Sequence, residues 1–178
     1  MPSFLIIAIV VGLTGLFAAC LLIYAIGKFN HLVTLRHRIS TEILQLDLAL
    51  RKQSAELQAL GGSPSKDFVS RLALAEEKSH RAVSGRLTGN NLALLSEASA
   101  LVASCWETAT TTGQDAVTKS AGNHQVATAK TWERIAALVV DYRDSLARLP
   151  GYAVALFSGF DPISPWPPLS KNRNPRGA

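Results

Sequence analysis

The chain has 178 residues, of which 48% are hydrophobic, and its formal net charge at pH 7 is +5. Its two cysteines, Cys20 and Cys105, fall in separate helical stretches and cannot plausibly pair, which excludes a disulfide-rich scaffold. The small positive charge is more simply explained by an anionic membrane surface than by nucleic acid, so we expect no nucleic-acid partner.

Residues 4–26 form an uncharged apolar segment, and no Lys, Arg, Asp or Glu precedes Lys28. Fourteen of its 23 residues are Leu, Ile, Val or Phe. As a helix it would be roughly 35 Å long, enough to cross a hydrocarbon core of about 30 Å. The fourteen strongly apolar residues favour insertion by roughly 4–8 kcal/mol. The segment lacks the positive start and short core of a cleaved signal peptide, so the sequence predicts a retained transmembrane helix.

The charges beside this segment predict its orientation. Lys28, Arg36 and Arg38 follow it closely, whereas only the terminal amine precedes it. Because basic residues stay on the cytoplasmic side, we expect a single pass through the cell membrane with a defined orientation. The short N-terminus would lie outside and the remainder of the chain in the cytosol.

Small residues recur along one face of the expected span, at spacings of 4, 3 and 4: Ala8, Gly12, Gly15 and Ala19. Such a face lets helix backbones approach closely in lipid. It would permit a homo-oligomer or contact with a partner's span. Small residues are also common in spans that make no such contact, so both readings stay open.

A long amphipathic helix is predicted from about residue 29 to residue 60, continuous or nearly so with the span, and Gly27 is its candidate hinge. Its apolar residues keep mostly to spacings of three and four, as one face of a helix requires. They are Leu32, Ile39, Ile43, Leu46, Leu50, Leu57 and Leu60. Arg36 and Gln53 are polar positions on the same seam.

Three further helices are expected, at about 66–84, 91–110 and 114–149. "GGSPS" and "SGRLTGNN" separate the first ones, and Pro150 ends the last. The start of the last helix stays open, because Gly122–Asn123 is a second candidate. No window alternates with period two, so no strand is expected. The sequence therefore predicts an all-α fold: an N-terminal transmembrane helix, then an antiparallel four-helix bundle over 28–160 with long first and last helices.

The last part of the chain, 161–178, is rich in proline and carries three basic residues. This composition predicts a disordered tail. Phe160 and Trp166 stand among or beside its prolines. This aromatic strip could dock on a partner or fold back on the bundle, and the sequence favours neither.

No pattern of catalytic or metal-binding residues is present. HExxH, CxxC, GxSxG and phosphate-loop motifs are missing. His31 and His37 fall on different helix faces and cannot share a metal. His80 and His124 are expected to be isolated and exposed, and Glu77 with His80 lacks a second set of ligands. We therefore expect no enzyme activity, no metal and no cofactor.

The two ends of the helical region resemble the LemA family of bacterial membrane proteins. The family's Tyr-Asn-x-Leu-Val-x-Leu-Arg pattern is similar to "FNHLVTLR" at 29–36, and its Ile-Asp-x-x-Leu-basic pattern to "LDLALRK" at 46–52. Its C-terminal Asp-Tyr-Asn, Pro and Ala-x-x-(Gly)-Phe elements are similar to "DYR" at 141–143, Pro150 and "ALFSGF" at 155–160. The positions that match are Asn30, Leu32, Val33, Leu35, Arg36, Asp47, Leu50, Tyr142, Pro150, Gly159 and Phe160.

The middle of the chain departs from this family. Its Glu-Ala-Tyr-Pro-Asp-Leu-Lys motif would fall near "ASCWETA", 103–109, which has neither the Pro nor the Lys. The resemblance implies a divergent LemA-type protein with an anchored helical bundle, and it implies no reaction. Most matching positions have structural interpretations: Leu32 in the buried seam, Pro150 as a helix stop and Asp47 in a salt bridge.

These observations predict a membrane-anchored protein that acts without catalysis, as a protein-interaction or scaffolding module at the cytosolic membrane face. Its partners would be the lipid bilayer and a protein whose identity the sequence does not give. The alternative is an outward-facing helical-bundle sensor of a small ligand. Such a sensor would signal through a partner protein, because the chain shows no output domain of its own.

Overall fold

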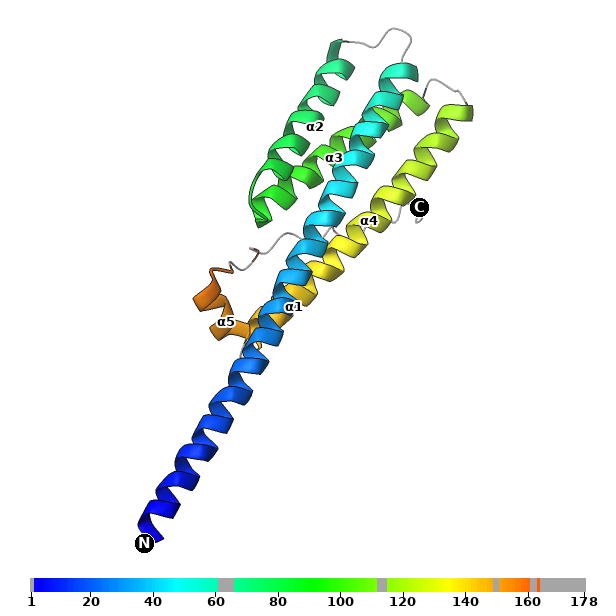
Figure 1. Cartoon of the computed structure of the whole chain (residues 1–178). Helices are drawn as coiled ribbons and strands as arrows, with labels where there is room; N and C mark the ends of the chain where they lie inside the picture. The colour runs from blue at the N-terminus through cyan, green and yellow to red at the C-terminus, as the bar shows by residue number, and fades with distance from the viewer. Residues whose placement is uncertain (1, 61–65, 112–114, 149–150, 161–162, 164–178) are drawn as a thin grey trace, which may run out of the picture. The chain divides into compact units, whose positions relative to one another are not determined.

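The computed structural model describes residues 2–60, 66–111, 115–148, 151–160 and 163. This part of the chain is helical almost throughout and contains no strand (Figure 1). Its helices are α1 (Pro2–Leu60), α2 (Lys66–Ser84), α3 (Gly89–Thr110), α4 (Asp115–Ala147) and α5 (Gly151–Ser158). The predicted all-α class is confirmed, as is a long apolar helix at the N-terminus.

Helix α1 is 59 residues long and runs without a break through Gly27, the expected hinge. Between Ile7 and Ile26 every side chain is exposed except that of Ala25, which is half-buried. Within the described ranges, α1 is the one helix long and apolar enough to cross a membrane. The apolar side chains from Ile7 to Ile26 are therefore not part of the protein core.

The chain divides into two compact units. The terminal unit comprises Met1–His37 and Asp141–Pro162, and the central unit comprises Arg38–Val140 and Ile163–Ala178. Helices α1 and α4 each contribute residues to both units.

The core of the terminal unit comes from α1 and the end of α4. Leu32 and Leu35 of α1 are buried, as are Tyr142 and Leu146 of α4. Each pair is three or four residues apart, so its members lie on one face of their helix. Leu32 is fully buried, which confirms its predicted place in the apolar seam.

The core of the central unit comes from one face of each of four helical segments. The buried apolar residues of α1 are Ile39, Ile43, Leu46, Leu50 and Leu57. Helix α2 adds Leu72, Ala75 and Ala82, and α3 adds Leu92, Leu95, Ala98, Val102, Cys105 and Trp106. Helix α4 adds Val117, Ala121, Trp132, Ile135 and Val139. Helix α2 packs against α3, and its small buried side chains let the two backbones approach closely.

Some helix bounds differ from those predicted. Helix α3 begins at Gly89, two residues early, because the Thr88 hydroxyl accepts a hydrogen bond from the amide of Asn91 and caps the helix. Helix α4 begins at Asp115 and continues through Gly122, which settles its start. It ends at Ala147.

Several predicted features lie outside the described residues. They are Pro150 as a helix stop, Leu149 and, apart from Ile163, the tail 161–178. Ile163 is buried, with 3% of its surface exposed. At that position the predicted tail is therefore packed rather than solvated.

Candidate functional site

The family-like pattern after the apolar segment lies entirely in the terminal unit and splits between two faces of α1. Leu32 and Leu35 are buried, Arg36 is half-buried, and Asn30 and Val33 are exposed. The pattern thus combines a core face with a face that is open to other molecules.

The family-like pattern at the other end of the chain lies in the same unit. Gly159, with φ of 66°, ends α5 in the left-handed conformation that side chains disfavour. The amide of Phe160 then donates to the carbonyl of Ala155 at 3.2 Å, as in a helix-ending turn. The ring of Phe160 meets that of Phe29 edge-on, with centroids 5.6 Å apart and an interplanar angle of 60°. Gly159 and Phe160 together fasten the end of α5 to α1.

Asp47 and Leu50 lie in the central unit and are both buried. The Asp47 carboxylate accepts hydrogen bonds from Arg51 Nε at 2.9 Å and from Ser79 Oγ of α2 at 2.5 Å. The salt bridge expected for Asp47 is therefore present. Its second bond, to Ser79, joins α1 to α2 and was not foreseen from the sequence.

A second polar cluster joins α1, α3 and α4. Nε2 of His124 lies 2.6 Å from Oε2 of Glu56, and the His124 ring lies against that of Trp106, with centroids 5.3 Å apart. The side chain of His124 is 19% exposed. The prediction that His124 is isolated and exposed is therefore wrong. Among the described residues, the buried indole N–H of Trp106 has no hydrogen-bond partner.

The sequence contained a signal for this cluster. Trp132, Ile135 and Val139 define the buried face of α4. Continuing their spacing of three and four toward the N-terminus passes through Thr128 to His124. The imidazole packs at the edge of the core because the carboxylate of Glu56 satisfies one of its nitrogens.

The other histidine considered, His80, is exposed on α2. Its neighbour Glu77 is paired with Arg81, at 2.5 Å between Oε1 and Nη2. The Glu77 carboxylate thus forms an ion pair along its own helix.

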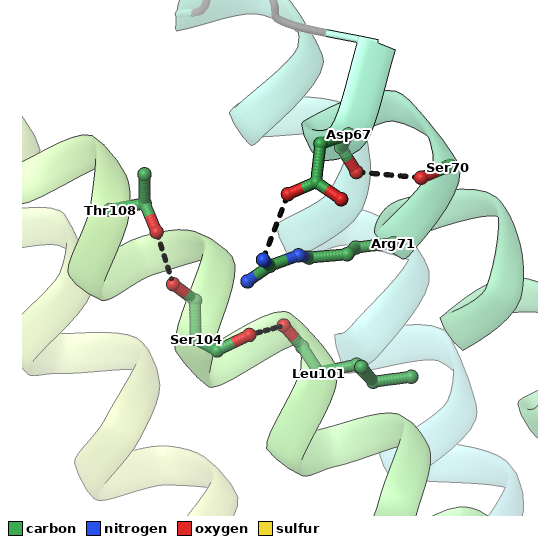
Figure 2. A network of polar contacts seen from close by, with 6 residues as sticks. All are labelled: Asp67, Ser70, Arg71, Leu101, Ser104 and Thr108. Carbon is green, nitrogen blue, oxygen red and sulfur yellow. Dashed lines mark hydrogen bonds and ion pairs between the residues drawn. The ribbon is translucent and has the colours of Figure 1, made fainter.

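Figure 2 shows short-range polar contacts along α2 and α3, around Arg71 and Ser104. The thiol of Cys105, the residue after Ser104, is influenced by both of these side chains. Arg71 pairs with Asp67 at 2.8 Å on α2, while on α3 the Thr108 hydroxyl donates to the carbonyl of Ser104. Burial raises the pKa of the Cys105 thiol above its ordinary value of 9.0, and the positive charge of Arg71 acts in the opposite direction. A thiol that is buried and protonated is a poor nucleophile. Cys105 is therefore a core residue.

A small apolar cavity of about 120 Å³ opens between α1, α2 and the start of α3. Its lining residues are Ser40, Ile43, Leu44, Ala82, Val83, Gly85, Leu87, Asn91 and Leu95. A side chain at Gly85 would meet the amide of Asn91 at 2.3 Å, and that amide donates to the carbonyl of Arg86 at 2.6 Å. An engineered apolar cavity of about 150 Å³ binds benzene, so this one could take only a small apolar group.

The small residues predicted to form a helix contact in the membrane are all exposed in the single chain. At Gly12 and Gly15, a Cβ would meet no atom within 4 Å apart from those of the adjoining residues and of the helix's own nearby backbone. The face of Ala8, Gly12, Gly15 and Ala19 is therefore open, and its contact with another helix remains a prediction.

Within the ranges that the structure describes, no three His, Cys, Asp or Glu residues are grouped so as to hold a metal ion. Comparisons with protein-family models, curated proteins and solved structures found no match to this chain. The resemblance to the LemA family therefore remains a prediction, and functional inference depends on the physical properties of the helices.

Proposed function

We propose that this chain is a membrane-anchored, LemA-type helical protein that acts without catalysis, by presenting helix surfaces to other proteins at the cytosolic membrane face. One observation carries the proposal. In α1 an apolar half with exposed side chains continues without a break into a half whose apolar seam is buried. Moving one large apolar side chain out of water is worth about 1.5–3 kcal/mol, so lipid is the favoured surrounding of the exposed half.

We also propose that the central unit is an antiparallel four-helix bundle. The contacts between α1 and α4 support opposite directions: Glu42 faces Arg134, whereas Glu56, further along α1, faces His124, which lies earlier in α4. The contacts between α3 and α4 have the same sense, because the Trp132 indole donates to Ser99 and Trp106 contacts His124.

The contacts of α2 also support antiparallel packing, against α1 and against α3. Ser79 of α2 reaches Asp47 of α1, and Lys78 of α2 pairs with Glu97 of α3. The apolar cavity combines the end of α2 with the start of α3, which suits a short connection between antiparallel neighbours. In such a bundle the polar groups fix the register of the helices.

The use of these polar groups supports a role in binding rather than in a reaction. Asp47, Glu56 and Glu97 each bond to a residue of another helix, as does His124. Groups held in this way stabilise one arrangement of rigid surfaces, which is what a scaffold requires.

The resemblance to the LemA family gains support from the terminal unit. The patterns at 29–36 and at 141–160 are more than a hundred residues apart in sequence, yet they share this unit. Phe29 and Phe160, one from each pattern, are in ring contact. If the two patterns serve to build one folded unit, their residues are expected to meet in space, as Phe29 and Phe160 do.

Two measurements on bacterial cells that express the full chain test the proposal. Alkaline extraction should leave the protein in the membrane pellet, whereas a variant with Leu13→Lys and Leu16→Lys should be released. A cysteine introduced at the C-terminus of a chain with Cys20→Ser and Cys105→Ala should be protected from an impermeant thiol reagent outside the cells. Release of the unmodified chain would refute the anchor.

The apolar cavity favours a second candidate, an outward-facing sensor of a small apolar ligand. Its lining is mostly aliphatic, and it joins three helices whose packing a ligand could alter. The same cysteine experiment separates the candidates. Labelling from outside intact cells would support the sensor and refute the cytosolic scaffold.

A further inference from the structure

Helix α5 is held close to the end of the apolar segment. Figure 1 shows α5 beside the end of α4 and the part of α1 that belongs to the terminal unit. The ring contact between Phe160 and Phe29 shows how close the end of α5 lies to the apolar segment. Phe29 is three residues beyond Ile26, the last residue of the apolar segment, and thus about 4.5 Å further along the helix axis.

The end of α5 has a defined conformation. Gly159 reverses the chain with a φ of 66°, and the amide of Phe160 bonds back to Ala155 at 3.2 Å. This helix-ending turn directs Phe160 toward α1. The position of α5 relative to the apolar segment is therefore set by backbone geometry together with an aromatic contact.

Exposed apolar side chains lie in this unit just beyond the apolar segment. The sequence of α5, "GYAVALFS", contains no charged residue. Leu156 is 68% exposed, and Phe29 and Val33 of α1 are 39% and 43% exposed. Isolated exposed apolar residues are ordinary, but these lie in one small unit at the end of a candidate span.

We propose that α5 is an interfacial helix that enters the headgroup region of the bilayer crossed by α1, with Leu156 toward the acyl chains. This inference rests on the proposed anchor. Each headgroup region is about 5–8 Å thick, because a bilayer of about 40–45 Å contains a hydrocarbon core of about 30 Å. With Ile26 at the hydrocarbon boundary, Phe29 and its contact with Phe160 fall inside that layer.

The surrounding side chains suit a lipid surface. Lys28 Nζ lies 5.9 Å from the centre of the Tyr24 ring, and both residues come from the turn that would cross the boundary. Aromatic rings and lysines are enriched at this depth, because a ring tolerates both phases and an ammonium reaches the phosphates. Arg148, exposed just before α5, adds a second positive charge on that side.

Lipid can cover the exposed face of α5 without a protein partner. The exposed face of α5 lies next to an apolar segment whose favoured surrounding is already lipid. The chain would thus contact the membrane twice, through the span and through α5. The second contact would restrict the tilt and rotation of α1 and so orient the rest of the terminal unit on the membrane surface.

The test uses the full chain with Cys20→Ser and Cys105→Ala, reconstituted in vesicles of phosphatidylcholine and phosphatidylglycerol. Single cysteines replace Leu156, Ser158 or Leu22 and carry an environment-sensitive fluorophore. Ser158 is exposed two residues after Leu156 and so lies on roughly the opposite side of α5. Leu22, exposed within the apolar segment, reports on the anchor.

Lipids brominated near the headgroup should quench the probe at position 156 strongly and the probe at position 158 weakly. Lipids brominated deep in the acyl chains should quench the probe at position 22. Quenching at 22 with none at 156 would overturn the interfacial helix while leaving the anchor intact, and would point to a protein occupant of this face. Equal quenching at 156 and 158 would also overturn it, because α5 would then have no lipid-facing side. Loss of quenching at all three positions would overturn the anchor as well.

Substitution of Leu156 should leave the fold intact, because the side chain is mostly exposed, and circular dichroism checks this. A second variant, Leu156→Asp, provides an independent readout through a probe at Ala153, which is half-buried on α5. Burial of a carboxylate among acyl chains is unfavourable, so quenching at 153 should fall. Unchanged quenching would contradict the proposed depth of α5.

Discussion

The buried carboxylate of Asp47 offers a quantitative test of how the central unit is held together. Asp47→Ala removes the acceptor of the Ser79 hydroxyl, and Ser79 is 2% exposed. A buried polar group left without a partner costs about 1–3 kcal/mol. Loss of the bond to Arg51 adds about 0.5 kcal/mol at most, because the Arg51 side chain is 51% exposed and the pair is four residues apart on one helix. The total expected loss in the free energy of unfolding is therefore about 1–3.5 kcal/mol.

Asp47→Asn is the matched control. The amide keeps an oxygen in nearly the same position for Ser79, and it loses the charge and the second oxygen, which accepts from Arg51. Its cost should therefore be about 1 kcal/mol or less. In the double variant with Ser79→Ala, the loss should be clearly smaller than the sum of the single losses, because both substitutions remove the same hydrogen bond.

Urea unfolding of the full chain in detergent micelles measures these differences. Trp106 and Trp132 are both buried in the central unit, so their fluorescence reports on the unfolding of that unit, and Trp166→Phe leaves these two as the only tryptophans. The slope of the free energy with urea should not change between variants. The reasoning is refuted if Asp47→Ala costs under about 0.5 kcal/mol, or if Asp47→Asn costs as much as Asp47→Ala, since the hydrogen bond would then not be the stabilising element.

Three further predictions concern single positions. Gly159→Ala places a side chain at a positive φ, which costs about 1–2 kcal/mol of strain. Opening of the turn should become easier by that amount, so hydrogen exchange of the Phe160 amide should be roughly 5–30-fold faster. Unchanged exchange would show that the turn does not hold α5. Leu46→Ala in the buried seam should lower the free energy of unfolding by about 2–5 kcal/mol. Leu48→Ala, at a 65% exposed position on the same helix, should change it by under about 0.5 kcal/mol. Similar losses for the two variants would contradict the assigned core face. Folding raises the pKa of the Cys105 thiol, so the unfolded chain releases this proton at lower pH than the folded chain does. Stability should therefore fall as the pH rises through the ordinary thiol pKa of 9.0. Urea midpoints measured across this pH range should show that Cys105→Ala removes that part of the pH dependence.

The sequence alone determined the helical class and the apolar half of α1, and the physical reason is that both are local. An uncharged run of Leu, Ile, Val and Phe is apolar whatever it contacts, and spacings of three and four define a helix face before any partner is present. Leu32, Leu46 and Leu50 were placed in the buried seam on this basis. Proline and glycine clusters separated the helices for the same local reason, and errors at their ends were about two residues.

Only the tertiary structure decided which polar residues meet. The bond of Asp47 to Ser79 and that of Glu56 to His124 join positions 32 and 68 residues apart, and no periodicity within one helix specifies such pairs. The same holds for Phe29 and Phe160, at opposite ends of the helical region, whose contact depends on the turn at Gly159. His124 was misjudged because a lone histidine is usually solvated, whereas its burial depends on a carboxylate that a different helix supplies. Contacts between helices depend on how their faces are rotated and offset against one another, and that information appears only when the helices pack.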